Sequence, residues 1–456
     1  MRSPLPINAR TVAFNILNDV DAKPEISLSD IMFELFDKSN LDERDRSLAA
    51  EIVYGVLRHR LFLDYVYQPL LKTRSYPPAS IQIILRMGIY QLLFLDRVPP
   101  HAAVNESVQI ISRLYSRKES GFVNAILRKV AAQKIEDVVL PDKKKSFEQY
   151  LSVKYSFPLW LVKKIISQCG KSDAEMFFSA SNQPAALTMR VNTLKTSIAD
   201  VANWIRDHHP EVDIETGKYC PEAINIKRLT IKIDWVPLMQ GWVYIQDEAS
   251  QLIAYLAAPK PGMRVVDYCS APGGKLTHIA AMADNNAELF ALDASRERLK
   301  LVAENCQRLG IKNVHIGDNA HSLLSELKQN PANIVLVDAP CSGLGILRRH
   351  PDLKWKKNER ALKKLPAEQS AILGSAASLV APNGALIYST CTIMRDENEG
   401  VITKFLKMHP DFEIGNPEKI LPQTPGDLIT SEGYLKISTA KTGMDGFFAV
   451  RLKRRS

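Results

Sequence analysis

Three short segments of this 456-residue chain carry side chains that could act together in thiol chemistry. Residues 267–275 read Asp-Tyr-Cys-Ser-Ala-Pro-Gly-Gly-Lys, and two later segments end in Cys341 and Cys391. A short apolar run, typical of a buried strand, precedes each of these two cysteines. Because the carboxyl ends of neighbouring parallel strands meet at one edge of a sheet, both thiols can converge on one substrate there. The pattern predicts a thiol acting beside a nucleoside-like cofactor.

The glycine-rich segment lies where a predicted strand turns into a helix, so a ligand could approach its backbone closely. It is neither the Gly-x-Gly-x-x-Gly fingerprint nor a phosphate-binding Walker loop. Asp293 and Asp318 are predicted to end the next two strands, where carboxylates can bind ribose hydroxyls or an adenine amino group. This pattern favours a cationic cofactor with an uncharged ribose, such as S-adenosylmethionine. The Ala-Pro-Gly-Gly-Lys turn, Asp293 and Asp318 are therefore candidates for contact with the cofactor, and Cys269 is a candidate wall of its pocket.

Cys341 and Cys391 stand at predicted strand exits, where a thiolate would be accessible and backbone amides could lower its pKa. A thiolate that adds to C6 of a pyrimidine makes C5 nucleophilic toward a methyl sulfonium, which is covalent catalysis. Asp338 is placed to assist protonation at N3 of the ring. The spacing alone leaves open which thiol attacks. Isolated cysteines are mostly small buried apolar residues, and we interpret three others in that way: Cys169, Cys220 and Cys306.

A basic segment begins directly after Cys341. Between residues 339 and 364, eight basic residues stand against two acidic ones. A solvated helix face is the common explanation of such a run, but its position beside the predicted active site favours contacts with nucleic-acid phosphates. The basic residues are Arg348, Arg349, Lys354, Lys356, Lys357, Arg360, Lys363 and Lys364, and the first five are our candidate RNA-binding residues.

The composition is that of a globular protein, with 46% hydrophobic and 24% charged residues and a net charge of +9. The first residues lack the apolar core of a signal peptide, and the most apolar region, 81–95, is interrupted by polar residues. The six cysteines are scattered and include no Cys-x-x-Cys pair, which argues against a zinc site and against a disulfide scaffold. We expect a cytoplasmic protein without metal or membrane contact, acting as a monomer.

The elements that must position these residues fall into three regions. Residues 1–140 show apolar residues at helical spacing, residues 141–240 mix helical and extended patches, and residues 241–456 alternate strands with helices. This predicts a helical bundle, a small α+β domain and a doubly wound parallel sheet. The strands expected in the last region are 265–267, 288–293, 314–316, 334–338, 385–388 and, as a possible edge strand, 447–452.

Several of these segments together resemble the RNA cytosine-C5 methyltransferases, and the likeness covers nearly the whole chain. The C-terminal motifs that carry it are Tyr244–Gln251, Asp267–Lys275, Asp338–Gly343, Arg348–Trp355, Ser389–Cys391 and Asp445–Phe448. The N-terminal segments are similar to a NusB-like domain: Val53–Arg58, Leu85–Gln91, Val98–Glu106 and Gly121–Arg128. Tyr268 and Ser270 depart from the Leu and Ala expected of the family, but they leave the Pro-Gly-Gly-Lys turn unchanged.

The resemblance implies an S-adenosylmethionine-dependent methyltransferase with a Rossmann-like catalytic domain. The cofactor-binding residues that it implies are Cys269, Ser270, Ala271, Pro272, Gly273, Gly274, Lys275, Asp293, Asp318 and Asp338. Cys391 would be the nucleophile, Cys341 would assist product release, and Asp338 and Lys275 would complete the catalytic set. The implied substrate is one cytosine of 16S ribosomal RNA, position 967, which must be turned out of its stack to reach the thiol. The NusB-like and middle domains would grip the RNA. Two alternatives remain: a transfer RNA cytosine methyltransferase, or a non-catalytic ribosome assembly factor.

Overall fold

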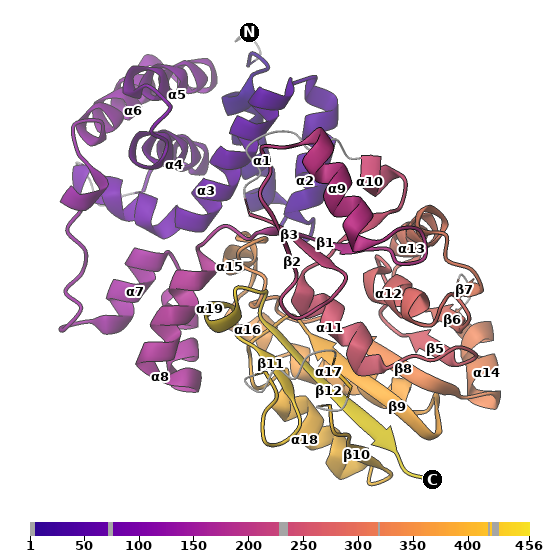
Figure 1. Cartoon of the computed structure of the whole chain (residues 1–456). Helices are drawn as coiled ribbons and strands as arrows, with labels where there is room; N and C mark the ends of the chain where they lie inside the picture. The colour runs from indigo at the N-terminus through magenta and orange to yellow at the C-terminus, as the bar shows by residue number, and fades with distance from the viewer. Residues whose placement is uncertain (1–4, 72–75, 228–235, 318–319, 418–419, 422–427) are drawn as a thin grey trace. The chain divides into compact units, whose positions relative to one another are not determined.

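The computed structural model describes all residues except 1–4, 72–75, 228–235, 318–319, 418–419 and 422–427. The chain forms two compact units (Figure 1). The first contains Met1–Asn182 together with His350–Glu359, and the second contains Gln183–Arg349 and Arg360–Ser456. A short segment from the C-terminal half of the sequence is therefore part of the N-terminal unit.

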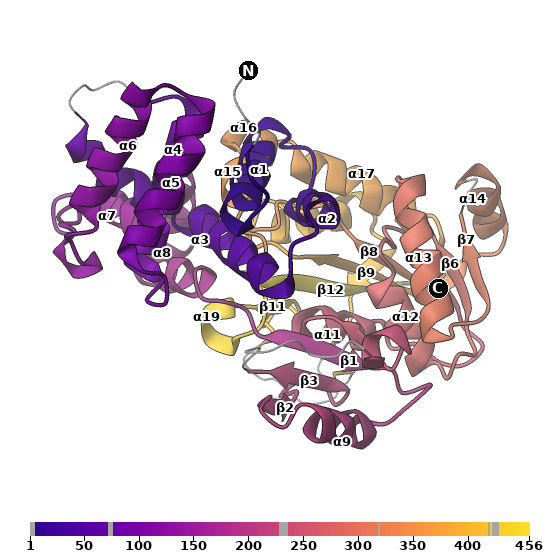
Figure 2. The same cartoon turned by 90° about the horizontal axis from the view of Figure 1, so that it is seen from above.

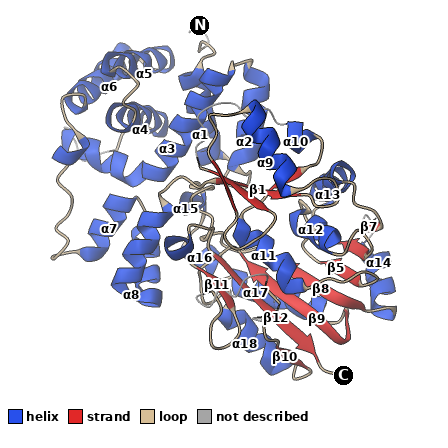
Figure 3. Ribbon diagram, viewed as in Figure 1, coloured by secondary structure: helices blue, strands red, loops and turns tan. Residues whose placement is uncertain are grey.

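The described part of the first unit is built from helices, as Figure 3 shows. Apolar side chains spaced at helical intervals, such as Ile16, Ile52 and Leu85, are buried in one shared core. This confirms the predicted N-terminal bundle. The unit continues through α7 and α8 to Asn182, so the expected break at residue 140 lies inside it. Its helices are α1 (Ala9–Ala22), α2 (Leu28–Ser39), α3 (Glu43–Tyr67), η1 (Gln68–Leu70), α4 (Ala79–Phe94), α5 (Pro100–Leu114), α6 (Arg117–Val130), η2 (Ile135–Asp137), α7 (Phe147–Tyr155), α8 (Leu159–Ser181) and α15 (Leu353–Lys356).

A small antiparallel sheet opens the second unit. Its strands are β1 (Leu187–Val191), β2 (Ile214–Thr216), β3 (Ala223–Ile226) and β4 (Val243–Ile245), in the order β2-β3-β1-β4. Apolar residues of the strands, including Met189 and Ile224, pack with Val201 and Ile205 of α9 (Ile198–His208). The short helix α10 (Val236–Met239) precedes β4. The predicted small α+β region is confirmed, although its sheet runs past residue 240.

The large sheet of the second unit has the strand order β10-β12-β9-β8-β5-β6-β7, with β11 paired to β12. The five strands from β9 to β7 in this order are parallel, whereas β12 is antiparallel to β9, β10 and β11. The predicted parallel, doubly wound sheet is confirmed for these five strands, whereas segment 447–452, a possible edge strand, lies inside the sheet between β10 and β9. The strands are β5 (Arg264–Asp267), β6 (Glu288–Ala291), β7 (Val314–Ile316), β8 (Ala332–Asp338), β9 (Val380–Thr390), β10 (Phe412–Ile414), β11 (Leu435–Ile437) and β12 (Phe447–Arg454).

Helices cover both faces of this sheet (Figure 2). Successive residues of a strand point to opposite faces, and Val265 and Val266 accordingly belong to different cores. The first core contains residues of α11 (Glu248–Ala257), α12 (Gly274–Met282) and α13 (Arg296–Leu309). The second contains residues of α14 (Ala320–Gln329), α17 (Leu365–Ala377) and α18 (Glu399–Met408). The remaining short helices are α16 (Glu359–Leu362) and α19 (Thr439–Thr442).

The chain reverses its direction of winding between β5 and β8, because β6 and β7 lie on one side of β5 and β8 and β9 on the other. In open α/β sheets such a switch point leaves a crevice outside the carboxyl ends of the strands. The parallel register aligns Asp338 of β8 with Ser389 of β9. The two cysteine-bearing turns therefore leave the sheet side by side.

Candidate active site

The two cysteines meet as the sequence predicted. The Sγ atoms of Cys341 and Cys391 lie 3.3 Å apart, and both residues are partly exposed. The backbone amide of Gly345 donates to the carbonyl of Cys391, which ties the two turns together on one side. A single substrate ring can therefore face both thiols.

The surroundings of Cys391 hold its proton in the substrate-free state. The hydrogen bond with Cys341, burial and the nearby Asp338 carboxylate raise the pKa of Cys391 well above its ordinary value, while the Lys275 ammonium acts in the opposite direction. A thiol with a raised pKa is a weak nucleophile until a proton acceptor or a cation arrives. Attack by Cys391 therefore requires loss of its proton in the loaded site.

Lys275 and Asp338 form the charged centre of the crevice. The Lys275 Nζ lies 2.6 Å from Asp338 Oδ2, and the Ser389 hydroxyl donates to Asp338 Oδ1 at 2.8 Å. Burial alone would lower the pKa of Lys275, but the ion pair with Asp338 raises it. The ammonium also lies 5.3 Å from the centroid of the Phe447 ring. The lysine is thus a fixed cation at the edge where Cys391 emerges.

The predicted cofactor turn is folded against Asp293 at the end of β6. The backbone amides of Ala271 and Ser295 donate to the two oxygens of this carboxylate, at 3.2 and 2.9 Å. Burial and the neighbouring carboxylates raise the pKa of Cys269 to about 12, so this thiol stays protonated. Ser270 is buried beside it. Asp293 both shapes the turn and keeps lone pairs for a ligand.

The glycines of the turn, together with Ala271 and Pro272, allow neighbouring groups to approach closely. Gly273 has φ of 98°, which a residue with a side chain rarely adopts. A Cβ on Gly274 would lie 2.9 Å from the Tyr244 ring. The turn therefore needs glycine at both positions, one for its backbone conformation and one for the ring beside it.

Asp267 is a further site residue. It belongs to the first motif of the sequence, but no role was predicted for it. It is buried at the end of β5, and its Oδ1 has no hydrogen-bond partner among the described residues. Burial and the charge of Asp338 raise the pKa of Asp267 to about 7, against the effect of Lys275. An unpaired buried carboxylate oxygen is costly, so this atom points to a ligand that donates a hydrogen bond or carries positive charge. The sequence could have indicated this role, because Asp267 is the last residue of a predicted strand and directly precedes the cofactor turn.

Arg190 of the small sheet is a second residue that the sequence reasoning missed. Its guanidinium is buried and donates to the carbonyl of Gly274 and to Gln246 Oε1, both at 2.6 Å, and to Thr277 Oγ1 at 3.0 Å. Burial lowers the pKa of Arg190 to about 10. The side chain thereby fastens β1 to the first turn of α12. Only the fold brings residue 190 to this place, so spacing in the sequence carried no signal.

Asp318, the third predicted carboxylate, lies outside the described residues. Its role in binding the cofactor stays a prediction.

The predicted RNA-binding arginines are engaged inside the protein. Arg348 lies 3.0 Å from Asp445 Oδ1, and Arg349 lies 2.7 Å from Asp445 Oδ2 and 2.9 Å from Asp247 Oδ2. Arg348 is buried. Burial lowers the pKa of Arg349, but the carboxylates of Asp445 and Asp247 outweigh this effect and raise the pKa above its ordinary value. The carboxylates oppose the cost of burying the arginine charges. These arginines organise the loop after Cys341, and their ion pairs inside the protein argue against the predicted phosphate contacts, which stay a prediction.

Lys354 and Lys356 are also paired within the first unit. The Lys354 ammonium is fully buried, lies 4.0 Å from the Phe157 ring centroid, and donates to Asn182 Oδ1 at 2.7 Å and to the carbonyl of Arg58 at 3.2 Å. Lys356 lies 3.1 Å from Asp352. This burial argues against contact between the Lys354 ammonium and RNA, and the RNA-binding role of Lys354 stays a prediction. Periodicity along the sequence does not show when a lysine is enclosed by backbone carbonyls.

The remaining basic residues of the run differ from these four. Lys357 is partly exposed, and Arg360, Lys363 and Lys364 are exposed at the start of the next segment of the second unit. A phosphate can reach exposed cations without breaking a buried ion pair. Within the basic run, Lys357, Arg360, Lys363 and Lys364 are therefore the residues that RNA phosphates can reach.

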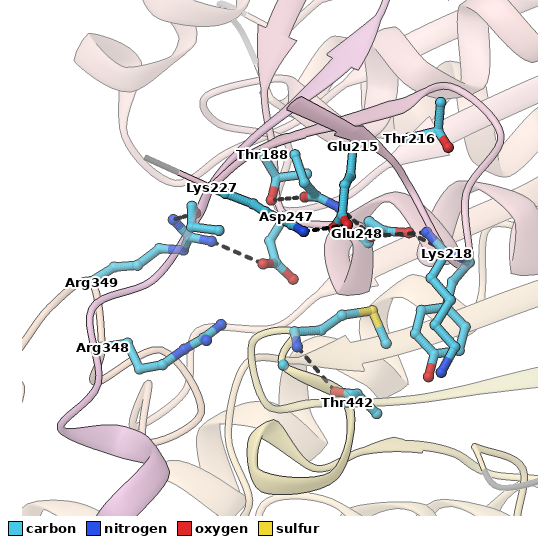
Figure 4. Close-up of a pocket in the computed structure, with 15 residues that line it drawn as sticks. Thr188, Glu215, Thr216, Lys218, Lys227, Asp247, Glu248, Arg348, Arg349 and Thr442 are labelled. Atoms are coloured by element: carbon cyan, nitrogen blue, oxygen red, sulfur yellow. Dashed lines mark hydrogen bonds and ion pairs between the residues drawn. The ribbon is translucent and has the colours of Figure 1, made fainter. Parts of the chain in front are cut away.

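A cavity of about 280 Å³ lies in the second unit beside the small sheet (Figure 4). Lys218 and Lys227 contribute positive charge to its wall, and Arg349 reaches Asp247 across it. Lys227 is paired with Glu215. The charges on the wall of the cavity are therefore largely balanced from within.

Among the described residues, no group of three or more His, Cys, Asp and Glu side chains is arranged to hold a metal ion. Within the same part of the chain, no helix is long and apolar enough to cross a bilayer.

Comparison with known families assigns each region of the chain. Residues 254–453 match the family described as 16S rRNA methyltransferase RsmB/F, residues 7–132 match the NusB family, and residues 157–231 match the ferredoxin-like domain of RsmF/B-like methyltransferases. These matches confirm the three predicted fold types and identify the small α+β region as ferredoxin-like.

Relatives that match over the full length of the chain support these family matches. The chain is 34% identical to a probable ribosomal RNA small subunit methyltransferase B of Synechocystis, over 98% of this chain and all of the relative. It is 30% identical to ribosomal RNA small subunit methyltransferase B of Klebsiella pneumoniae, over 98% and 99% of the two chains. The crystal structure of PH0851 matches over the whole of both chains, with a TM-score of 0.78 and 25% identity. NSun6 from Pyrococcus horikoshii with SFG shares the fold over 66% of this chain, with a TM-score of 0.57 and 21% identity.

Proposed function

The chain belongs to the ribosomal RNA small subunit methyltransferase B (RsmB) family of 16S rRNA cytosine methyltransferases, and we propose that it methylates C5 of cytosine 967 through a covalent adduct between Cys391 and C6. The observation that carries the proposal is the 3.3 Å approach of two thiols beside the Lys275–Asp338 ion pair. Its setting would be the cytoplasm, where thiols stay reduced.

The residues of the crevice fit S-adenosylmethionine, which supplies an electrophilic methyl group when bound. Asp293 would hold the ribose hydroxyls, since its oxygens keep lone pairs beyond those used by Ala271 and Ser295. Asp267 offers a buried carboxylate oxygen that lacks a partner among the described residues, which suits a cationic ligand. The pocket walls would be Cys269 and the Pro-Gly-Gly turn, and this turn carries no phosphate-cradling loop.

The proposed roles follow from the positions of the side chains. Cys391 adds to C6 of the cytosine, and the electron pair of the C5–C6 double bond moves so that C5 becomes nucleophilic. Asp338 would lie beside N3 of the ring and assist its protonation. Its carboxylate accepts hydrogen bonds from Lys275 and Ser389. After methylation the C5 proton passes to a base, the C5–H electron pair re-forms the C5–C6 double bond, and Cys391 leaves C6 as a thiolate; Cys341 assists this elimination. The Lys275 cation favours the thiolate form of Cys391.

Mapping 5-methylcytosine in 16S rRNA tests the proposal. Cells that lack the protein should lose the modified base at position 967 and regain it when the gene is restored, but not when Cys391→Ala is supplied. Purified protein with the methyl donor should modify the same base in 16S rRNA and leave transfer RNA unmodified. Methylation of transfer RNA alone, or a complemented signal with Cys391→Ala, would contradict the proposal.

A further inference from the structure

A buried carboxylate lies directly behind the two cysteines. Glu397 is almost fully enclosed, as are Ser342, Thr392 and Gln369 around it. Ser342 follows Cys341 in the chain, and Thr392 follows Cys391. The carboxylate is therefore surrounded by the residues next to both thiols.

The contacts show that one side chain fastens both turns. Glu397 Oε2 accepts the backbone amide of Ser342 at 2.8 Å, and Oε1 accepts its hydroxyl at 2.6 Å. The hydroxyls of Ser342 and Thr392 lie 2.6 Å apart, and Thr392 also reaches Glu397 Oε1 at 3.4 Å. Glu397 thus joins the residue after one cysteine to the residue after the other.

Two amide side chains complete the support from outside. Gln369 of α17 donates both to Glu397 Oε2, at 3.0 Å, and to the carbonyl of Pro340, the residue before Cys341. Asn398 accepts from the Thr390 hydroxyl at 2.6 Å and donates to the Thr392 carbonyl at 3.0 Å, which spans Cys391. Each cysteine is therefore held on both sides, and Glu397 lies where the two supports meet.

We propose that Glu397 is a positioning residue that fixes the distance between the Cys341 and Cys391 thiols. Among the hydrogen bonds of the described residues Glu397 reaches neither thiol, and it acts through Ser342 and Thr392. Addition by one thiol and elimination assisted by the other require both sulfurs at the same ring, and a 1 Å misplacement can cost about 100-fold in rate. The role in turnover rests on the proposed function, whereas the role in spacing the thiols does not.

The first arm of the test measures methyl transfer. Glu397→Ala should lower kcat by about 100-fold and leave KM for S-adenosylmethionine within about twofold, because the cofactor residues lie at β5 and β6. Glu397→Gln keeps the shape and can hydrogen-bond to the same groups if the Ser342 and Thr392 hydroxyls turn, so it should recover most of the rate. Asp396→Asn, an exposed neighbour, is the matched control and should behave as the unaltered protein.

The second arm measures how readily the Cys341 and Cys391 thiols form a disulfide, and it needs no RNA. In a glutathione redox buffer, oxidised glutathione takes up the two electrons: both protein thiols lose their protons, one S–S bond forms in the protein, and two glutathione thiols are released. The equilibrium gives the effective concentration of one thiol at the other. Glu397→Ala should lower it by about tenfold or more, and Glu397→Gln should restore it.

The outcomes separate this inference from the proposed function. Unchanged kcat and unchanged effective thiol concentration in Glu397→Ala would overturn it. If that variant does not fold, Ser342→Ala decides, because it deletes one hydroxyl of the network and retains Glu397; an unchanged thiol equilibrium there also overturns it. An unaltered protein that methylates no 16S rRNA, while Glu397→Ala still loosens the thiols, would refute the proposed function and leave the positioning role standing.

Discussion

At the scale of single residues, the two thiols are close in space but differ in what surrounds them. Cys391 is subject to the field of both Lys275 and Asp338, whereas Cys341 begins the loop that Arg348 and Arg349 hold to the protein. Lys275 opposes the rise in the pKa of Cys391 that the hydrogen bond with Cys341, burial and Asp338 cause, so it supplies the cation that a thiolate of Cys391 would need in the loaded site.

Substitution of each cysteine should therefore give opposite results. Cys391→Ala cannot form the C6 adduct, so it should neither methylate nor crosslink to RNA. Cys341→Ala should add and transfer the methyl group but eliminate slowly, and it should accumulate a protein–RNA complex that survives denaturing electrophoresis. If the trapped complex appears only in Cys391→Ala, the nucleophile is Cys341.

The buried carboxyl of Asp267 predicts a pH dependence of cofactor binding. Because its pKa is raised to about 7, the group is protonated below that pH and ionised above it. Affinity for the cationic cofactor should rise by up to about tenfold per pH unit below 7 and level off above it. Calorimetry should show a flat profile for Asp267→Asn. The exposed Asp284→Asn is the control and should retain the slope.

The raised pKa of Asp267 also makes the stability of the folded protein depend on pH. The folded protein binds the Asp267 proton more tightly than the unfolded chain, so this group contributes stability at low pH that is lost as the pH rises from about 4 to about 7. Urea unfolding without cofactor should show this trend, and Asp267→Asn should reduce it.

At the scale of elements, patterns that repeat along the sequence predicted the structure well. Strand β7 has the predicted bounds, and β5 differs from its predicted bounds by one residue. Short strands such as β10 and β11 lack enough residues to show alternation, and β12 lies inside the sheet because β10 pairs beyond it. The convergence of the thiols was predictable since both follow neighbouring parallel strands. The roles of Arg190 and Glu397 were not, because they depend on contacts between distant segments.

The basic run illustrates the same limit and gives a prediction. Its first part is folded into the protein, so the salt dependence of RNA binding should depend on Arg360, Lys363 and Lys364. Replacing these three by Ala should flatten the slope of log affinity against log salt by roughly two to three units. Removal of Lys404, Lys407 and Lys453, which are exposed in the same unit, should change the slope by less than about one unit if they lie away from the RNA. Equal slopes for both triple variants would rule out a specific footprint at residues 360–364.

At the scale of the whole molecule, the N-terminal unit is not continuous in sequence. Segment 350–359 supplies the buried Lys354 ammonium, and Trp355 Nε1 donates to the carbonyl of Leu57 at 2.7 Å. Both contacts satisfy backbone carbonyls near the middle of α3. The segment is therefore a structural component of the helical unit.

Truncation of this lysine should destabilise the protein. Lys354→Ala leaves the Arg58 carbonyl and the Asn182 oxygen without their buried donor, and we expect a loss of about 2–3 kcal/mol in the free energy of unfolding. Lys354→Met retains the volume without burying a charge and should cost less. Lys357→Ala, in the same segment but partly exposed, should leave the denaturant midpoint unchanged. Unfolding in urea measures all three, and a Lys354→Ala protein as stable as the unaltered one would show that the buried ammonium is dispensable.

The discontinuous N-terminal unit also has a consequence for the order in which the protein is made. Residues 183–349 are synthesised between Asn182 and His350, so the helices emerge from the ribosome before the segment that completes them. At a translation rate of about 5–20 residues per second, this interval lasts roughly 10–30 s. During that time the nascent helical unit lacks Lys354 and Trp355 and carries exposed carbonyls where they will bind. Native closure of the first unit is thus delayed until much of the catalytic domain has been translated.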